Sequence, residues 1–266
     1  MSDIIDAAAP TSAELARQPP RSNVAAETEI SPCRRDLTRW AQGFSFIFWG
    51  LLAVLFTIAE TLGLPTFAAY SPSIGGFEPV HRLMLDVYSM TIGSAGVLGL
   101  VMGCWRLYQT KGLGRSWKSC SLGLLLLSIA IAYLFPFFCM WRRVPANPYL
   151  FAHVVAWAIA LIGEMSLLSV AVGVLAKRTG RSSLAVQAAL YGAVTFIVLF
   201  TPFAPLAIQL MRITWGGGNP LVALQFLLTT IPPVYVFVVL LPLALTLSLA
   251  WTAKDIALRQ LIAGES

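Results

Sequence analysis

The chain has 266 residues, of which 58% are hydrophobic and only 11% are charged. A soluble domain carries about 25% charged residues, so this composition excludes a soluble globular protein and indicates one whose solvent is lipid. The net charge of +6 would suit nucleic acid if the basic residues gathered on one solvated face. Here they stand between apolar runs, so we expect a lipid bilayer and no nucleic acid as partner.

The N-terminal residues 1–36 are polar, rich in Ala and Pro, and aperiodic. Such a segment buries too little surface to offset the entropy of ordering, so we predict a disordered cytoplasmic tail. Asp3 and Asp6 stand where a cleavable signal peptide would carry basic residues. We therefore expect no cleaved signal, and we expect the first apolar run to act as a signal anchor.

Six apolar segments follow the tail, and each has the roughly 20 residues needed to cross a hydrocarbon core about 30 Å thick. Within lipid they must be helical, because no water satisfies exposed backbone groups. In chain order they are Trp40–Leu64, Leu83–Leu107, Trp117–Trp141, Tyr149–Ala176, Leu184–Met211 and Leu221–Thr252. The sequence thus predicts an all-α, polytopic integral membrane protein, with a six-helix transmembrane domain over residues 37–254 and a short cytoplasmic tail over residues 255–266.

Prolines interrupt the last two segments. The sixth is too long for one simple span, since at 1.5 Å per residue it would measure about 48 Å, and it contains the pair Pro232 and Pro233. Proline removes a backbone donor and clashes with the preceding turn. We therefore predict a half-length piece over Leu221–Ile231, re-entrant or interfacial, followed by a spanning helix. The same reasoning predicts a break in the fifth segment at Pro202 and Pro205.

The basic residues alternate between connections in a way that predicts the orientation. One set of connections and ends holds Arg34, Arg35, Arg39, Arg106, Lys111, Arg115, Lys118, Lys177, Arg178, Arg181, Lys254 and Arg259. The opposite set holds Arg82, Arg142, Arg143 and Arg212. Cytoplasmic loops carry the excess of Lys and Arg, so we place both termini in the cytoplasm and the chain in the cell inner (plasma) membrane. Trp40, Trp105, Trp117, Trp141 and Trp251 fall at segment ends, as in an interfacial aromatic belt.

Glu164 is the strongest candidate functional residue, because ionisable groups inside a membrane are costly and each is therefore a functional hypothesis by default. It lies near the middle of the fourth segment, and His153 and Trp157 share its helical face. Ser166, Ser169 and Gly173 form a small-residue face suited to close helix contact. The acid either lines a cavity or proton path, or is neutral and bonded to a neighbouring helix.

A second set of candidates lies at the outer ends of the first four segments. We predict that Glu60, His81, Asp86, Arg142 and His153 form one patch there. Beyond Asp86, the second segment carries a stripe of small residues on which another helix can pack tightly. The stripe consists of Ser89, Gly93, Gly96 and Gly103.

His81 and His153 are the two histidines of the chain. Two histidines on neighbouring helices are the ligand set of a b-type haem, and nearby carboxylates would add metal ligands. The alternative is that both are amphipathic, hydrogen-bonded residues at the interface. Cys33, Cys104, Cys120 and Cys139 form no C-x-x-C pair, and we predict that they are small apolar fillers.

Three functions are compatible with this pattern. The first is a scaffold, assembly factor or subunit of a membrane complex with no catalysis of its own, working with protein partners. The second is a small-solute or proton-coupled transporter that uses Glu164. The third is a redox subunit that holds haem through His81 and His153. No nucleotide-binding or hydrolase motif is present in the sequence, which favours a chain that is not an enzyme, with no catalytic residue and no bound cofactor.

Overall fold

The computed structural model describes residues 34–70, 78–111, 114–230 and 233–263. For residues 63–70, 78–86, 229, 233–237, 239 and 263 it describes the backbone alone. The described residues form helices α2 (Arg34–Tyr70), α3 (Glu78–Tyr108), α4 (Gly114–Arg143), α5 (Pro148–Arg178), α6 (Ser182–Trp215), α7 (Pro220–Thr230) and α8 (Pro233–Ala263).

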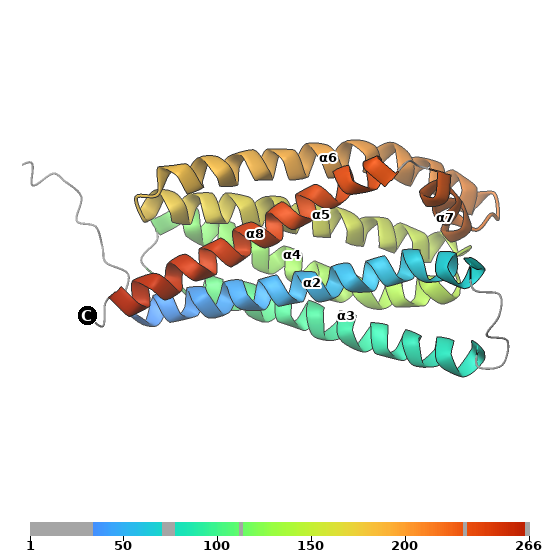
Figure 1. Ribbon diagram of the computed structural model, residues 1–266, viewed down its shortest axis with the longest axis horizontal. Coiled ribbons are helices and arrows are strands. Elements are labelled where there is room, and N and C mark those ends of the chain that lie inside the picture. The colour runs from blue at the N-terminus through green and yellow to red at the C-terminus, as the bar shows by residue number, and fades with distance from the viewer. Residues whose placement is uncertain (1–33, 71–77, 112–113, 231–232, 264–266) are drawn as a thin grey trace, which may run out of the picture. The chain divides into compact units, whose positions relative to one another are not determined.

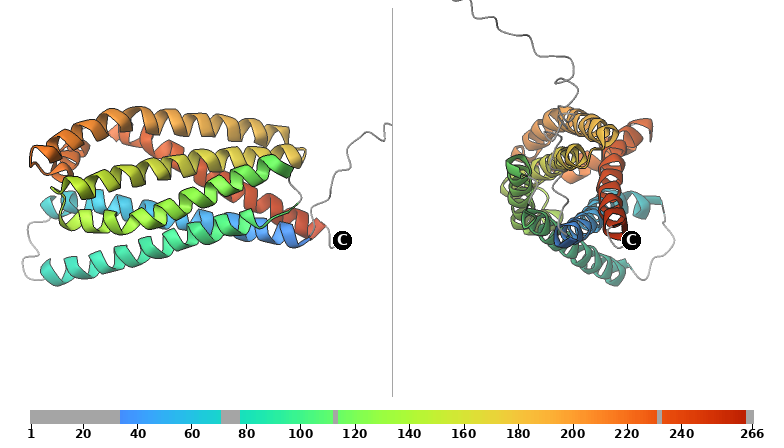
Figure 2. Two further views of the ribbon diagram at one scale, coloured as in Figure 1. Left: turned by 180° about the vertical axis from the view of Figure 1, so that it is seen from behind. Right: turned by 90° about the vertical axis from the view of Figure 1, so that its left-hand side faces the viewer.

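Six long helices of the unit 33–266 lie side by side and close into a ring. Each packs on the next in the order α2, α3, α4, α5, α6 and α8, and α8 packs in turn on α2. Figure 1 shows the first residues of α2 and the last residues of α8 at the same end of this bundle, and Figure 2 views it end-on. Helix α5 also contacts α8, so it has neighbours on three sides.

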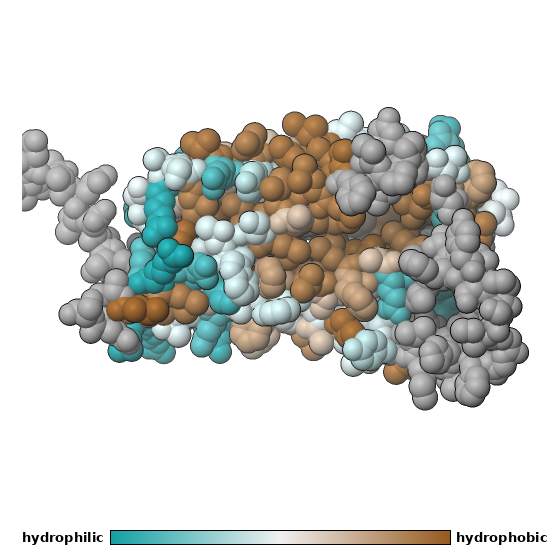
Figure 3. All heavy atoms as spheres, viewed as in Figure 1, coloured by the Kyte–Doolittle hydropathy of each residue, from teal (hydrophilic) through white to brown (hydrophobic). Residues whose placement is uncertain are grey.

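The outer surface of the bundle is apolar along most of its length. Large side chains such as Trp49, Leu126 and Phe196 are half exposed or more, and Figure 3 shows hydrophobic residues over the middle of one face with hydrophilic residues gathered toward the end where α2 begins. Six helices among the described residues are long and apolar enough to cross a membrane. The predicted all-α polytopic bundle and its six spans are therefore confirmed.

The predicted division of the sixth segment is also confirmed. Helix α7 ends at Thr230, and a separate helix, α8, begins at Pro233, the second residue of the proline pair. Helix α7 contacts α2 and α6 and lies at the end of the bundle opposite the beginning of α2 (Figure 1).

The predicted break in the fifth segment is wrong. Helix α6 continues from Ser182 to Trp215 through Pro202 and Pro205, and α4 likewise continues through Pro136. A single proline costs one backbone hydrogen bond and bends a helix, and within a membrane the surrounding helices keep it intact. Two adjacent prolines end a helix because they remove successive donors.

The ends of the bundle differ slightly from the predicted domain limits. Helix α2 begins at Arg34 and therefore includes Asp36, which the sequence assigns to the tail. Helix α8 continues to Ala263, well into the predicted C-terminal tail of 255–266. The predicted disorder of the N-terminal tail concerns residues that lie outside the described part of the chain.

Helices α2 and α3 approach each other through glycines. A Cβ atom at Gly96 would lie 2.7 Å from the Cβ of Ala53 and 2.9 Å from the carbonyl oxygen of Gly50. A Cβ atom at Gly103 would lie 2.7 Å from the carbonyl oxygen of Gly43. The predicted small-residue stripe on the second span is thus confirmed as a contact surface, with α2 as the partner at Gly96 and Gly103 and with α2 and α4 both at Gly93.

An asparagine followed by a proline opens both α5 and α7. The side chain of Asn147 accepts hydrogen bonds from the backbone nitrogens of Tyr149 and Leu150, at 3.0 and 3.3 Å. Asn219 accepts equivalent bonds at the start of α7. Each asparagine satisfies two of the backbone donors that a helix leaves unpaired at its beginning.

We expect Asn147→Ala to lower the free energy of unfolding by about 1 kcal/mol, because it leaves those two donors without their acceptor. Denaturant unfolding of the detergent-solubilised protein, followed by circular dichroism, measures the change. Asn147→Asp keeps the acceptor oxygen and is the matched control. Equal losses for both substitutions would contradict the capping role.

Candidate functional site

Glu164 lies near the middle of α5 and is fully buried inside the bundle. Its Oε1 accepts a hydrogen bond from the Cys104 thiol of α3 at 3.1 Å, and Ser128 of α4 lies within hydrogen-bonding reach of the same thiol. Helix α3 therefore places a thiol on the carboxyl of α5, and α4 brings Ser128 to that thiol. The prediction that Glu164 faces protein rather than lipid is confirmed.

The second carboxyl oxygen, Oε2, is buried and has no hydrogen-bond partner among the described residues. A buried polar atom without a partner costs free energy. The carboxyl is therefore half satisfied, and among the described residues it is the one acidic side chain in the middle of a span. These two properties make the group of Glu164, Cys104 and Ser128 the candidate functional site, which we call the buried acid site.

The rest of α5 packs on α4 and α6. Trp157 is buried against α4, with its ring centroid 4.7 Å from that of Phe138. On the α6 side, a Cβ atom at Gly192 would lie 3.1 Å from the Cβ of Ser169, and one at Gly173 would lie 3.7 Å from the Cβ of Ala188. The predicted central position of this helix is confirmed.

His153 differs from expectation. It shares the face of Glu164 by helical spacing, yet its ring is only partly buried and stacks on Phe137 with centroids 4.3 Å apart. Its Nδ1 lies 2.8 Å from the carbonyl oxygen of Tyr149. Near the N-terminal end of α5 the ring packs against Phe137 of α4, so a continuous polar stripe from His153 to Glu164 is not formed.

The predicted outer patch is described in part. Arg142 of α4 donates a hydrogen bond to Ser89 of α3 at 3.0 Å, so these two helices meet there through polar groups. Both carboxyl oxygens of Glu60 are buried without a hydrogen-bond partner among the described residues. The side chains of His81 and Asp86 lie outside the described residues, so a haem held by His81 and His153 stays a prediction.

Cys104 is a residue of the candidate site that the sequence analysis did not assign to it. It is buried, as predicted for a filler, but it also donates to Glu164 across 60 positions of sequence. No local pattern marks that pairing, because the two residues belong to non-adjacent spans. A buried thiol that meets a buried acid becomes visible only once the helices are placed.

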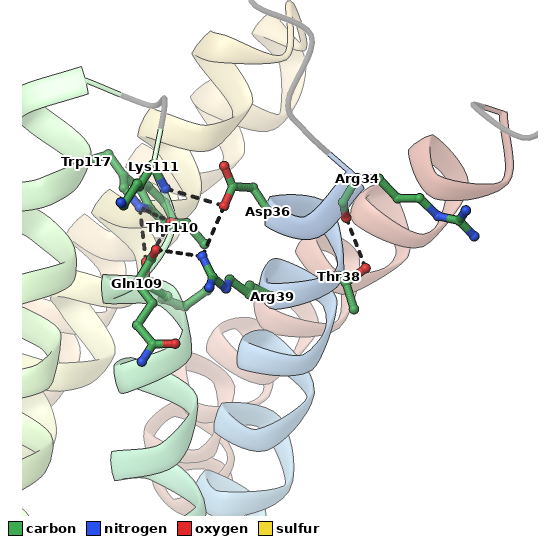
Figure 4. A network of polar contacts seen from close by, with 9 residues as sticks. Arg34, Asp36, Thr38, Arg39, Gln109, Thr110, Lys111 and Trp117 are labelled. Carbon is green, nitrogen blue, oxygen red and sulfur yellow. Dashed lines mark hydrogen bonds and ion pairs between the residues drawn. The ribbon is translucent and has the colours of Figure 1, made fainter.

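The end of the bundle where α2 begins holds a polar network (Figure 4). Arg39 Nη1 donates to the carbonyl oxygen of Gln109 at 3.0 Å and pairs with Asp36 Oδ1 at 3.5 Å. The backbone nitrogen of Lys111 lies 3.5 Å from the same Asp36 oxygen. This end, which we call the basic end, joins α2 to the connection after α3 and carries the larger set of basic residues named above.

Tryptophans at this end differ from a simple lipid-facing belt. Trp40 and Trp117 are buried with ring centroids 6.2 Å apart, and Trp117 Nε1 donates to Thr110 Oγ1 at 2.7 Å. Trp141, at the opposite end, is buried too. Trp105 and Trp251 are the members of the predicted belt that are exposed. Tryptophans at the helix ends therefore fall into two groups, those packed inside the bundle and those exposed on its surface.

Within the described residues, no group of three or more His, Cys, Asp and Glu side chains is arranged to hold a metal ion. Comparison of the chain with protein-family models, curated proteins and solved structures gives no match. The fold and site together define a polytopic α-helical membrane protein with one acid enclosed at the middle of its most buried span.

Proposed function

We propose that the chain is a non-catalytic membrane scaffold or subunit of a membrane complex, in which the buried acid site fixes the positions of α3, α4 and α5. The observation that most directly supports this proposal is that Glu164 is completely buried and accepts a hydrogen bond from Cys104. A carboxyl in that position is in its cheapest state when neutral and hydrogen-bonded, which is the arrangement that a structural role needs.

The packing around the site supports the same role. The most buried span is α5, and it contacts α4, α6 and α8. Threonine hydroxyls elsewhere in the core donate to carbonyl oxygens of their own helices, as at Thr61 and Thr214. Core hydroxyl groups that are bonded within their own helices leave the outer surfaces of the bundle free to contact partner subunits.

Proton-coupled transport is the second candidate, and the unpartnered Oε2 of Glu164 favours it. An intramembrane carboxyl with one unused oxygen can release and accept a proton if water reaches it in another conformation. The two functions make opposite predictions for one substitution. Glutamine keeps the size of the side chain and an acceptor oxygen, but it cannot exchange a proton.

We expect vesicles that contain the wild-type protein and vesicles that contain Glu164→Gln to have the same proton permeability, equal to that of protein-free vesicles. The measurement uses a pH-sensitive dye trapped in the lumen after an imposed pH step. Circular dichroism in detergent confirms that the variant is folded. Proton flux in the wild type that the substitution abolishes would overturn the scaffold proposal and support transport.

A positive test of the scaffold role uses native membranes. Chemical crosslinking before solubilisation is expected to place the chain in one discrete complex with a fixed stoichiometry to a partner protein. Glu164→Gln should preserve that complex. Cys104→Ala should weaken it, because the carboxyl then loses its hydrogen bond, at a cost of about 1–3 kcal/mol in unfolding free energy.

A further inference from the structure

An open pocket of about 550 Å³ lies between α2 and α3 at the basic end. Its lining residues on each helix are spaced i, i+3, i+4 and i+7, which places them on one face. On α2 they are Arg35, Thr38, Arg39 and Gln42. On α3 they are Met102, Trp105, Arg106 and Gln109. Two antiparallel stripes therefore face a common groove.

The groove is strongly cationic. Three guanidinium groups line it, from Arg35, Arg39 and Arg106, and its lining residues include no carboxylate. Asp36 offsets part of the charge of Arg39, with which it pairs at 3.5 Å. That pair and the bond from Arg39 to the carbonyl oxygen of Gln109 hold one guanidinium in place (Figure 4). A net positive charge from Arg35 and Arg106 remains for an anion.

Toward the middle of the bundle, the groove is lined by Met102 and Trp105 of α3 and by Gln42 of α2. Met102 and Trp105 are each 46% exposed. At 1.5 Å per residue, Met102 lies about 10 Å deeper along α3 than Gln109. Cations at the water-facing end and the apolar side chains of Met102 and Trp105 deeper in the groove match the two parts of a phospholipid. A soluble anion would use only the first part.

We propose that this groove binds the phosphate headgroup of an anionic phospholipid in the leaflet at the basic end, with the first carbons of an acyl chain along Met102 and Trp105. Arginine forks suit phosphate oxygens, and basic pockets between transmembrane helices recognise anionic headgroups. This site is independent of the buried acid site and of the function proposed for it.

Trp105 provides the readout. Full-length protein in neutral detergent is titrated with brominated phosphatidylglycerol or with brominated phosphatidylcholine, and quenching of tryptophan fluorescence is recorded. The difference in quenching between the wild type and Trp105→Phe is the signal from the groove. We expect phosphatidylglycerol to quench this signal at a much lower mole fraction than phosphatidylcholine. Removing one charge, in Arg35→Gln or Arg106→Gln, should weaken the binding about fivefold, since one basic residue near an anionic surface contributes about 1 kcal/mol.

The controls separate the groove from the overall positive charge. Arg181→Gln removes a charge from the α5–α6 connection at the same end, where the side chain makes no capping bond, and it should change the binding less than twofold, because exposed charges farther apart than the Debye length of about 8 Å are largely screened. Arg106→Lys retains the charge and loses the fork, so it should bind more tightly than Arg106→Gln and less tightly than the wild type. Equal quenching by the two lipids, or displacement of phosphatidylglycerol by inorganic phosphate, would overturn the proposal.

Discussion

Gly96→Leu is expected to separate α2 from α3 and to lower the free energy of unfolding by about 3 kcal/mol or more. Even a single carbon at this position would lie 2.7 Å from the Cβ of Ala53 and 2.9 Å from the carbonyl oxygen of Gly50. Both neighbours belong to the body of α2, so no flexible side chain can move aside. The helices must shift apart along their length, and the contacts on either side of the glycine are lost with them.

The measurement compares unfolding of matched alanine variants in detergent. Gly96→Ala adds one carbon against backbone, whereas Gly163→Ala adds one carbon that meets Leu127 at an ordinary contact distance of 3.5 Å. The first should be clearly destabilised, and the second should be unchanged or slightly more stable, because alanine is the better helix former. Similar midpoints for the two alanine variants would show that α2 and α3 do not approach as closely as described.

Orientation gives the second large effect, since labelling from one side of a membrane is all or none. Trp215 at the end of α6 is 72% exposed, and Ser182 at its beginning is exposed too. In intact cells, Trp215→Cys should react with a membrane-impermeant maleimide. Ser182→Cys should react only after the membrane is opened, because the basic end is predicted to face the cytoplasm.

The wild-type protein, which retains its own cysteines, supplies the background for this experiment. A reporter fused after Ser266 should give the same orientation as Ser182→Cys. If Ser182→Cys were labelled in intact cells and Trp215→Cys were protected, the topology would be the reverse of the predicted one. It would also show that the basic residues do not follow the positive-inside rule in this chain.

Most of the fold could be predicted from the sequence, because each span carries its own evidence. An apolar run of membrane length must be a helix wherever it lies, and the pair Pro232 and Pro233 ends one without help from its surroundings. The continuity of α6 through Pro202 and Pro205 could not be predicted in this way. Whether a single proline breaks a helix depends on the neighbours that hold the two halves together, and those neighbours are a tertiary property.

The candidate site was predictable for one residue and not for its partners. A single acidic residue within an apolar span is energetically costly and therefore easy to recognise, so Glu164 could be identified from the sequence. Its partner Cys104 could not, since a thiol in an apolar run is usually a filler. His153 was expected to belong to the site, because helical spacing aligns it with Glu164. Its ring packs instead against the aromatic rings of Phe137 and Tyr149.

The contact between α2 and α8 has a consequence for biogenesis. The ring centroid of Phe48 of α2 lies 5.1 Å from that of Trp251 of α8. The first and the last described helices are therefore in direct contact and close the ring. During synthesis α2 enters the membrane long before α8 has been made. It can pair at once with α3 through their glycines, while the face that receives α8 lacks that helix until the ring closes. The arrival of α8 is therefore the step at which the cell can distinguish a finished bundle from an unfinished one.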